Sequence, residues 1–246
     1  MASSAVAPYT TRLSSNMPAD KKRQATQRFT WTGTDGNQRS FSYWCYLPPD
    51  APPTSRLPLL LFLHGAGERG NNLSLVCKHG PPKLIEQGED FPFVVIAPQC
   101  PFDQWWTMPQ NLIGLAKLVE QVSADYPIDP ERMYVTGMSM GGYGTWQLAA
   151  TYPKLFAAIV PICGGTNLSQ AVALQSIPVW AFHGRDDDIV PLIRSQEIID
   201  ELTKIGSDAT LTIYDNVRHD SWSATYANRE IYDWLLTHKT SNSFGE

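Results

Sequence analysis

The sequence has few cysteines, no basic cluster and no long apolar run, and each shortage argues against a class of protein. Only four cysteines occur among 246 residues, and none belongs to a C-x-x-C pair, which argues against a zinc site or a thioredoxin-type motif. No apolar run approaches the roughly 18 residues that a membrane-spanning helix requires. The formal net charge is −5 and there is no basic patch, so we expect neither nucleic acid nor an anionic membrane as a partner.

The N-terminal segment also lacks the apolar stretch of a secretory signal. Residues 1–26 are rich in Ser and Thr and contain several basic residues, which is typical of a disordered tail. The alternative interpretation is an organelle transit segment, which has a similar composition. Because no signal is visible, we expect a cytoplasmic protein whose thiols are reduced.

Residues 27–240 have the pattern of one α/β domain. The chain is 43% apolar, which is enough for a packed core. Stretches rich in aromatic residues and Thr, at 28–32 and 39–47, predict an antiparallel strand pair joined by a turn at 34–37. Apolar runs typical of strands buried on both faces follow at 57–63, 91–97, 133–136, 156–162, 179–182 and 210–214.

Apolar residues at helical spacing fill the intervals between these runs, at 112–126, 140–151, 198–205 and 227–238. An antiparallel pair followed by alternating strands and helices predicts a mostly parallel sheet of about eight strands, with helices on both faces. The longer irregular stretches cover only 65–82 and 100–110. We therefore expect no separate cap domain.

The strongest chemical signal is the G-x-S-x-G pattern Gly137-Met-Ser139-Met-Gly141. It follows an apolar strand and precedes a predicted helix, which is the context of a nucleophile elbow. Glycine at both flanking positions removes side chains that would collide across so sharp a turn. We predict that Ser139 is a nucleophile; the alternative is a glycine-rich turn without chemistry.

A serine hydroxyl is a weak nucleophile and needs a base. In this architecture the acid and then the histidine follow the serine along the chain. His219 and His238 both lie far enough downstream. His219 stands in a polar loop after the last predicted strand, whereas His238 falls within the terminal helical pattern. The sequence therefore favours His219 as the base, and a helix-capping role is the alternative.

The acid is expected directly after the strand at 179–182. Three adjacent carboxylates, Asp186, Asp187 and Asp188, occur there. One of them has to orient the imidazole and stabilise its protonated form. Neighbouring side chains in a turn point in different directions, so we expect only one to reach the histidine. The pattern itself leaves the choice open.

Acyl-transfer chemistry also requires N–H groups that stabilise an oxyanion. The residue after the nucleophile, Met140, supplies one of them. The second is expected from the loop after the strand at 57–63, where small residues let the backbone approach a substrate. We assign it to Ala66, with Gly67 as the alternative. His64 ends a buried strand, and we interpret it as structural.

Four segments of the chain carry motifs of this kind: His64-Gly-Ala-Gly-Glu-Arg-Gly70, Gly137-Met-Ser-Met-Gly-Gly-Tyr-Gly-Thr-Trp146, His183-Gly-x-x-Asp187-x-x-Val-Pro191 and His219-Asp-Ser-Trp222. Together they resemble the α/β-hydrolase superfamily over residues 28–238. The most similar members are small lidless esterases of the phospholipase/carboxylesterase, dienelactone hydrolase and prolyl-oligopeptidase-like groups.

The resemblance implies an α/β-hydrolase fold without a cap, and its His-Gly-x-x-Asp spacing implies Asp187 as the acid. Dienelactone hydrolases carry a cysteine where this chain has Ser139, which argues against that activity. A tryptophan in the loop at 100–110 lines the acyl or alcohol site in similar proteins. We assign this role to Trp106, with core packing as the alternative. Trp222 is expected to wall the site beside the base.

These residues predict a serine hydrolase that cleaves carboxylic esters with short, medium or aromatic acyl groups. Its partner is a small-molecule ester, and the chemistry implies no metal and no organic cofactor. The alternatives are a peptidase or another acyl transferase with the same triad, and a non-catalytic ligand-binding protein on the hydrolase fold. An exposed edge strand would allow a homodimer, although no motif demonstrates one.

Overall fold

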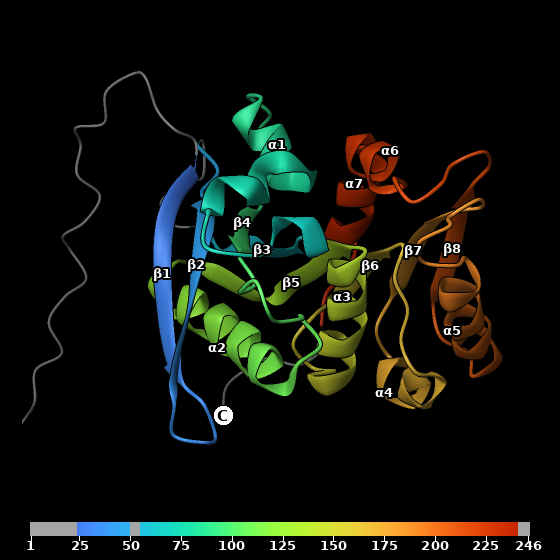
Figure 1. Ribbon diagram of the computed structural model, residues 1–246, viewed down its shortest axis with the longest axis horizontal. Coiled ribbons are helices and arrows are strands. Elements are labelled where there is room, and N and C mark those ends of the chain that lie inside the picture. The colour runs from blue at the N-terminus through green and yellow to red at the C-terminus, as the bar shows by residue number, and fades with distance from the viewer. Residues whose placement is uncertain (1–23, 50–54, 241–246) are drawn as a thin grey trace, which may run out of the picture.

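The computed structural model describes residues 24–49 and 55–240 (Figure 1). They form one eight-stranded sheet in the order β1-β2-β4-β3-β5-β6-β7-β8. The tail predicted at 1–26 lies outside the described residues, apart from its last three residues. These belong to β1 (Gln24–Thr32).

The sheet begins with an antiparallel pair and continues with parallel strands. β1 pairs with β2 (Gln38–Tyr46), and β2 pairs antiparallel with β4. The turn between β1 and β2 places Gly36 at φ +77°, a conformation that glycine adopts without strain. The remaining strands are β3 (Leu57–Leu63), β4 (Val94–Pro98), β5 (Ile128–Met138), β6 (Ala158–Ile162), β7 (Val179–Gly184) and β8 (Ala209–Tyr214). The prediction of a mostly parallel eight-stranded sheet is confirmed.

Helices cover both faces of the sheet because the central strands are apolar on both sides (Figure 1). Along β3, Leu59 and Leu61 belong to one core, whereas Leu60 and Phe62 belong to the other. The first core is covered by α2 (Pro109–Asp125), α3 (Met140–Thr151), α4 (Ala171–Leu174) and α5 (Ile193–Lys204). The second is covered by α1 (Gly80–Glu86), α6 (Trp222–Ala227) and α7 (Glu230–Leu236).

The C-terminal stripe at 227–238 forms part of two helices, where the sequence predicted one. The backbone of Asn228 is extended, with φ −80° and ψ 112°. Its side-chain oxygen accepts a hydrogen bond from the Glu230 N–H at 3.0 Å. Asparagine favours such capping positions because its oxygen satisfies a donor at the helix start. Because α7 ends at Leu236, His238 lies beyond it and not within a helix, as the sequence had predicted. That part of the prediction is wrong.

The stretch at 65–82, expected to be irregular, also contains short helical segments. They are the 3-10 helices η1 (Ala66–Glu68) and η2 (Leu73–Lys78), followed by the first turn of α1. Asn72 caps η2 by accepting a hydrogen bond from the Ser74 N–H. The Gly70 N–H donates to the Cys100 carbonyl at 2.9 Å, which ties the loop after β3 to the loop after β4.

The carboxyl ends of the parallel strands meet at one edge of the sheet, which is where ligands bind in open α/β folds. Ser139 follows β5, near the middle of the sheet, and Asp187 and His219 follow β7 and β8. Among the described helices, none has both the length and the apolar character that crossing a membrane would need.

Candidate active site

Ser139 occupies the sharp turn between β5 and α3. Its backbone has φ +53° and ψ −115°, a conformation that costs free energy for any residue with a side chain. A Cβ at Gly141 would lie 1.9 Å from the Leu63 carbonyl oxygen, and one at Gly137 would lie 2.4 Å from the Gly141 carbonyl oxygen. Main-chain atoms cannot give way, so only glycine fits on either side of the serine.

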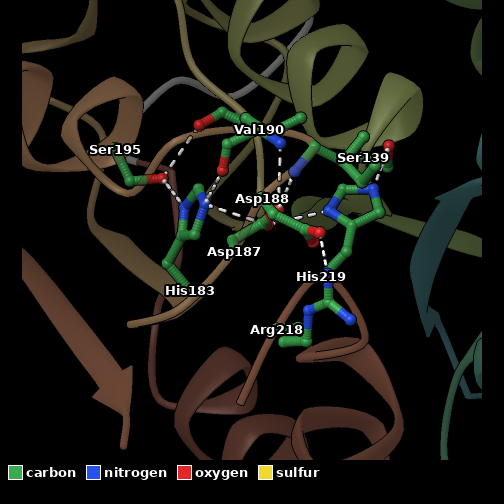
Figure 2. A network of polar contacts seen from close by, with 10 residues as sticks. Ser139, His183, Asp187, Asp188, Val190, Ser195, Arg218 and His219 are labelled. Atoms are coloured by element: carbon green, nitrogen blue, oxygen red, sulfur yellow. Dashed lines mark hydrogen bonds and ion pairs between the residues drawn. The ribbon is translucent and has the colours of Figure 1, made fainter. Parts of the chain in front are cut away.

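His219 reaches Ser139 from the loop after β8 (Figure 2). Its Nε2 lies 2.9 Å from Ser139 Oγ, and its Nδ1 lies 2.7 Å from Asp187 Oδ2. The structure therefore brings together the three residues that the sequence selected. His238, the rejected alternative, instead contacts Trp234 and the Asp208 carboxylate.

Asp187 is separated from its two neighbours by burial and hydrogen bonding. Its Oδ1 accepts backbone N–H groups of Ile189 and Val190, both at 2.9 Å. Asp186 and Asp188 are exposed, and Asp188 forms a surface ion pair with Arg218 (Figure 2). Only the middle carboxylate of the three therefore faces the imidazole.

The surroundings of Asp187 keep it ionised. Burial opposes ionisation, but the hydrogen bonds from His219, Val190 and Ile189 together outweigh it and hold the pKa of Asp187 below its usual value. A charged carboxylate here can accept the Nδ1–H of His219 and leave Nε2 free to accept a proton. That is the tautomer in which the imidazole can act as a base toward Ser139.

A second histidine, His183, supports the acid loop from inside the protein. It is fully buried, and its Nε2 lies 2.8 Å from the Val190 carbonyl oxygen and 3.3 Å from Asp187 Oδ2. Its Nδ1 lies 2.8 Å from the Ser195 hydroxyl. Burial lowers the pKa of His183, which favours the uncharged ring, and the ring holds the loop through its contacts with Val190 and Asp187. We predicted no role for His183 from the sequence, although a histidine that ends a buried strand is a signal for such support.

The N–H groups assigned to an oxyanion come from the starts of two helical segments. Met140 is the first residue of α3 and Ala66 is the first residue of η1. First-turn N–H groups have no partner within their own helix and are available to a ligand. The positive end of the α3 dipole also favours negative charge next to Ser139.

His64 ties the loop after β3, residues 64–70, to the loop after β4. We call residues 64–70 the oxyanion loop because Ala66 lies in it. Its Nδ1 donates to the Gly65 carbonyl at 2.6 Å, and its Nε2 accepts the Cys100 N–H at 3.0 Å. Burial lowers the pKa of His64 to about 4. The ring is therefore neutral and can make both bonds, which fits the structural role predicted for it.

Trp106 differs from its predicted role as a substrate contact. It has no exposed surface, and its indole N–H donates to the His64 carbonyl at 3.0 Å. It packs against Phe41 in the first core. The alternative interpretation, that Trp106 is a core residue, therefore describes its position. Its neighbour Trp105 points outward and is 46% exposed, because adjacent side chains in this turn face opposite ways.

Trp222 lies beside the base. Its ring stands edge-on to His219 with the centroids 5.2 Å apart, and it makes a similar contact with His79 at 5.6 Å. The tryptophan is half-buried. It therefore limits the orientations open to His219, while its predicted contact with a substrate stays a prediction.

A buried thiol also adjoins the base. Among the described residues, Cys163, Asp187 and His219 form the one group of potential metal ligands, with ligand atoms within 4.8 Å of one another. Burial raises the pKa of Cys163 to about 12, so the thiol is protonated and a poor ligand. Asp187 and His219 are already hydrogen-bonded to each other, an arrangement that suits proton transfer. That the chemistry needs no metal stays a prediction.

A serine, aspartate and histidine on the loops after β5, β7 and β8 of such a sheet define an α/β-hydrolase. The chain belongs, within that class, to the Phospholipase/Carboxylesterase family, whose profile matches residues 50–235.

Known proteins similar to this chain include esterases and a polyester depolymerase. A crystal structure of a thermostable esterase is 33% identical with a TM-score of 0.75, covering 87% of this chain and 63% of that one. The bifunctional acetylxylan esterase/xylanase XynS20E of Neocallimastix patriciarum is 28% identical over 148 residues, which are 59% of this chain and 21% of that protein. Poly(3-hydroxyoctanoate) depolymerase of Pseudomonas fluorescens is 28% identical over 173 residues, 58% of this chain and 61% of that protein. The chain thus spans less than two thirds of each of these proteins.

Proposed function

We propose that this protein is a carboxylesterase that hydrolyses carboxylic esters through an acyl-enzyme on Ser139. The observation that carries the proposal is the hydrogen-bonded line from Ser139 Oγ through His219 to Asp187, at 2.9 and 2.7 Å. Membership of the Phospholipase/Carboxylesterase family supports it. The esterase names of several relatives support an ester over an amide.

The reaction begins when His219 Nε2 takes the proton from Ser139 as the hydroxyl oxygen attacks the ester carbonyl. Asp187 holds the imidazole through Nδ1–H and stabilises the imidazolium. The N–H groups of Met140 and Ala66 donate to the oxyanion of the tetrahedral intermediate. His219 then gives its proton to the leaving alcohol, and the acyl group stays on Ser139.

Water enters the second half of the cycle. His219 removes a proton from it, the resulting nucleophile attacks the acyl-enzyme, and the acid product leaves as Ser139 recovers its proton. These steps need no metal or organic cofactor. Ser139 is half-buried, and no cap domain stands among the described residues, which suits short, medium or aromatic acyl groups. Feruloyl esterase B of Neurospora crassa, 27% identical over 159 residues, supports the aromatic option.

The test is Ser139→Ala assayed with p-nitrophenyl acetate and with a fluorophosphonate probe. We expect loss of p-nitrophenol release and of labelling. Ser169→Ala is the matched control because Ser169 is exposed and lies outside the site. Turnover retained by Ser139→Ala would refute the nucleophile, and an intact enzyme that no probe labels would favour a non-catalytic binder. A matched amide cleaved as fast as the ester would favour a peptidase.

A further inference from the structure

A groove opens beside the proposed oxyanion loop, with a volume of about 480 Å³. Arg69, Asn71 and Asn72 contribute its polar lining, and Leu75, Pro101 and Phe102 contribute apolar surface. These residues follow β3 and β4. In the sheet, β3 lies between β4 and β5, and neighbouring strands are ~4.8 Å apart. Arg69 of the groove lining donates to the carbonyl of Ala66, the residue whose N–H is assigned to the oxyanion, so the groove adjoins the proposed site.

Arg69 is a cation without a carboxylate partner among the described residues. Its Nε donates to the Ala66 carbonyl at 2.9 Å and its Nη1 to the Gln104 carbonyl at 3.3 Å. Its guanidinium lies over the rings of Trp105 and Phe102, 5.1 and 5.9 Å from their centroids. Neutral carbonyls and rings hold the side chain in place, and none of these contacts is an ion pair with its positive charge.

The other polar groups of the groove also offer donors. Asn72 uses its side-chain oxygen to accept from the Ser74 N–H and hydroxyl, so the NH₂ group is what it has left for a ligand. Asn71 is exposed and carries a second amide. Guanidinium and amide donors together complement an acceptor that carries negative charge, above all a carboxylate.

The apolar part of the groove fits the body of the same ligand. Phe102 is 77% exposed, which is unusual for so large an apolar side chain. Leu75 and Pro101 extend the surface beside it. A ligand with an apolar body and a carboxylate end would cover the aromatic ring and neutralise Arg69 at once.

We propose that this groove is a subsite for a carboxylate-bearing part of the ester substrate. The inference rests on the proposed esterase function and adds a substrate class to it: esters that also carry a free carboxylate. The guanidinium of Arg69, which forms no ion pair with the described residues, is the feature that selects them.

The test compares two substrates that differ mainly in charge, 4-acetoxybenzoate and 4-acetoxybenzamide. Both lose the same acetyl group, and the measured quantity is the ratio of their kcat/KM values. Asn71→Asp should lower this ratio and Asn71→Lys should raise it, each by about three- to tenfold, as expected of one charge near a partly hydrated site. Arg69→Gln should lower the ratio by about tenfold, and added salt should reduce all these differences.

Val172→Asp is the control for added charge, because Val172 is 75% exposed on α4 and does not line the groove. The ratio of the two kcat/KM values for this variant should match the ratio for the unaltered enzyme. Equal ratios in the two Asn71 variants, or shifts in the same direction, would overturn the subsite. If Ser139→Ala is inactive at the same time, the proposed function stands without the subsite; if Ser139→Ala remains active, the proposed function itself fails.

Discussion

The two sides of Ser139 along the sheet edge are built differently. Toward β7 and β8, the polar atoms of Asp187 and His183 are buried and meet their partners at 2.7 to 3.3 Å. Toward β4, Arg69 meets only carbonyls and aromatic rings, and Phe102 is exposed. On the side toward β7 and β8, which we call the closed side, the polar atoms of Asp187 and His183 have partners, whereas the side toward β4 is the open side, where Arg69 forms no ion pair with the described residues.

The proposed function accounts for this difference. Proton transfer requires donors and acceptors held to a fraction of an ångström, which buried and fully bonded groups provide. Recognition of a substrate requires groups that gain a partner only when the substrate arrives. The closed side therefore suits the reaction and the open side suits selection, and changes on the two sides should have different consequences.

The largest effect is expected from Asp187→Asn on the closed side. An amide cannot hold His219 in the tautomer that accepts a proton, so kcat should fall by about 10³- to 10⁴-fold. Asp188→Asn is the matched control, since that carboxylate lies at the surface beside Arg218, where an ion pair stabilises little. Steady-state kinetics with p-nitrophenyl acetate measure both variants, and equal losses would contradict the assignment of the acid.

A second contrast compares one added methyl group in the turn at Ser139 with one in the loop of the open side. Gly141→Ala places a Cβ 1.9 Å from the Leu63 carbonyl oxygen, whereas a Cβ at Gly67 would meet nothing within 4 Å. Because the backbone has to move, Gly141→Ala should lower the free energy of unfolding by about 4 kcal/mol or more. Gly67→Ala should stay within about 0.5 kcal/mol. Urea denaturation followed by circular dichroism compares the two, and similar midpoints would contradict the packing described.

A third, smaller effect concerns His64 beneath the open side. A histidine in an unfolded chain takes up a proton near pH 6.5, but burial lowers the pKa of His64 to about 4 in the folded protein. Between these values only the unfolded chain binds that proton, so the stability falls as the pH falls. The loss should reach about 3 kcal/mol near pH 4. Denaturation at several pH values should show a shallower decline for His64→Gln, and an unchanged slope would contradict the burial of this ring.

The smallest effect is expected from thiol reagents. All four cysteines are buried, and burial raises the pKa of Cys163 to about 12. The thiol beside the base should thus resist alkylation. Incubation with N-ethylmaleimide should leave esterase activity unchanged, while the unfolded protein should take up the reagent. Rapid inactivation of the native enzyme would show that the closed side opens.

The sequence was sufficient to predict that Ser139 and His219 lie together, because strands and helices determine their positions. Ser139 and His219 follow from a motif, a predicted strand and the order along the chain, and the helix expected at 140–151 matches α3. The choice of Asp187 over Asp186 and Asp188 came from family resemblance. Its physical reason is the pair of backbone donors at Ile189 and Val190, which depends on the path of the loop.

Loop geometry also explains what the sequence did not predict. Trp105 and Trp106 are adjacent, and no periodic pattern tells which of them points inward. The indole N–H of Trp106 found a carbonyl partner at His64, 42 residues away in the chain. Such long-range contacts have no local signature. The same holds for Arg69, whose partners lie on two separate loops.

The order of Ser139, Asp187 and His219 along the chain also determines when a newly synthesised polypeptide can carry out the proposed reaction. Synthesis delivers the hydroxyl at 139 first, the carboxylate at 187 next and the imidazole at 219 last. A nascent polypeptide that has exposed only its first two hundred residues to solvent holds a serine with nothing to take its proton. On the proposed mechanism, hydrolysis begins only after β8 has paired with β7 and His219 has reached Ser139.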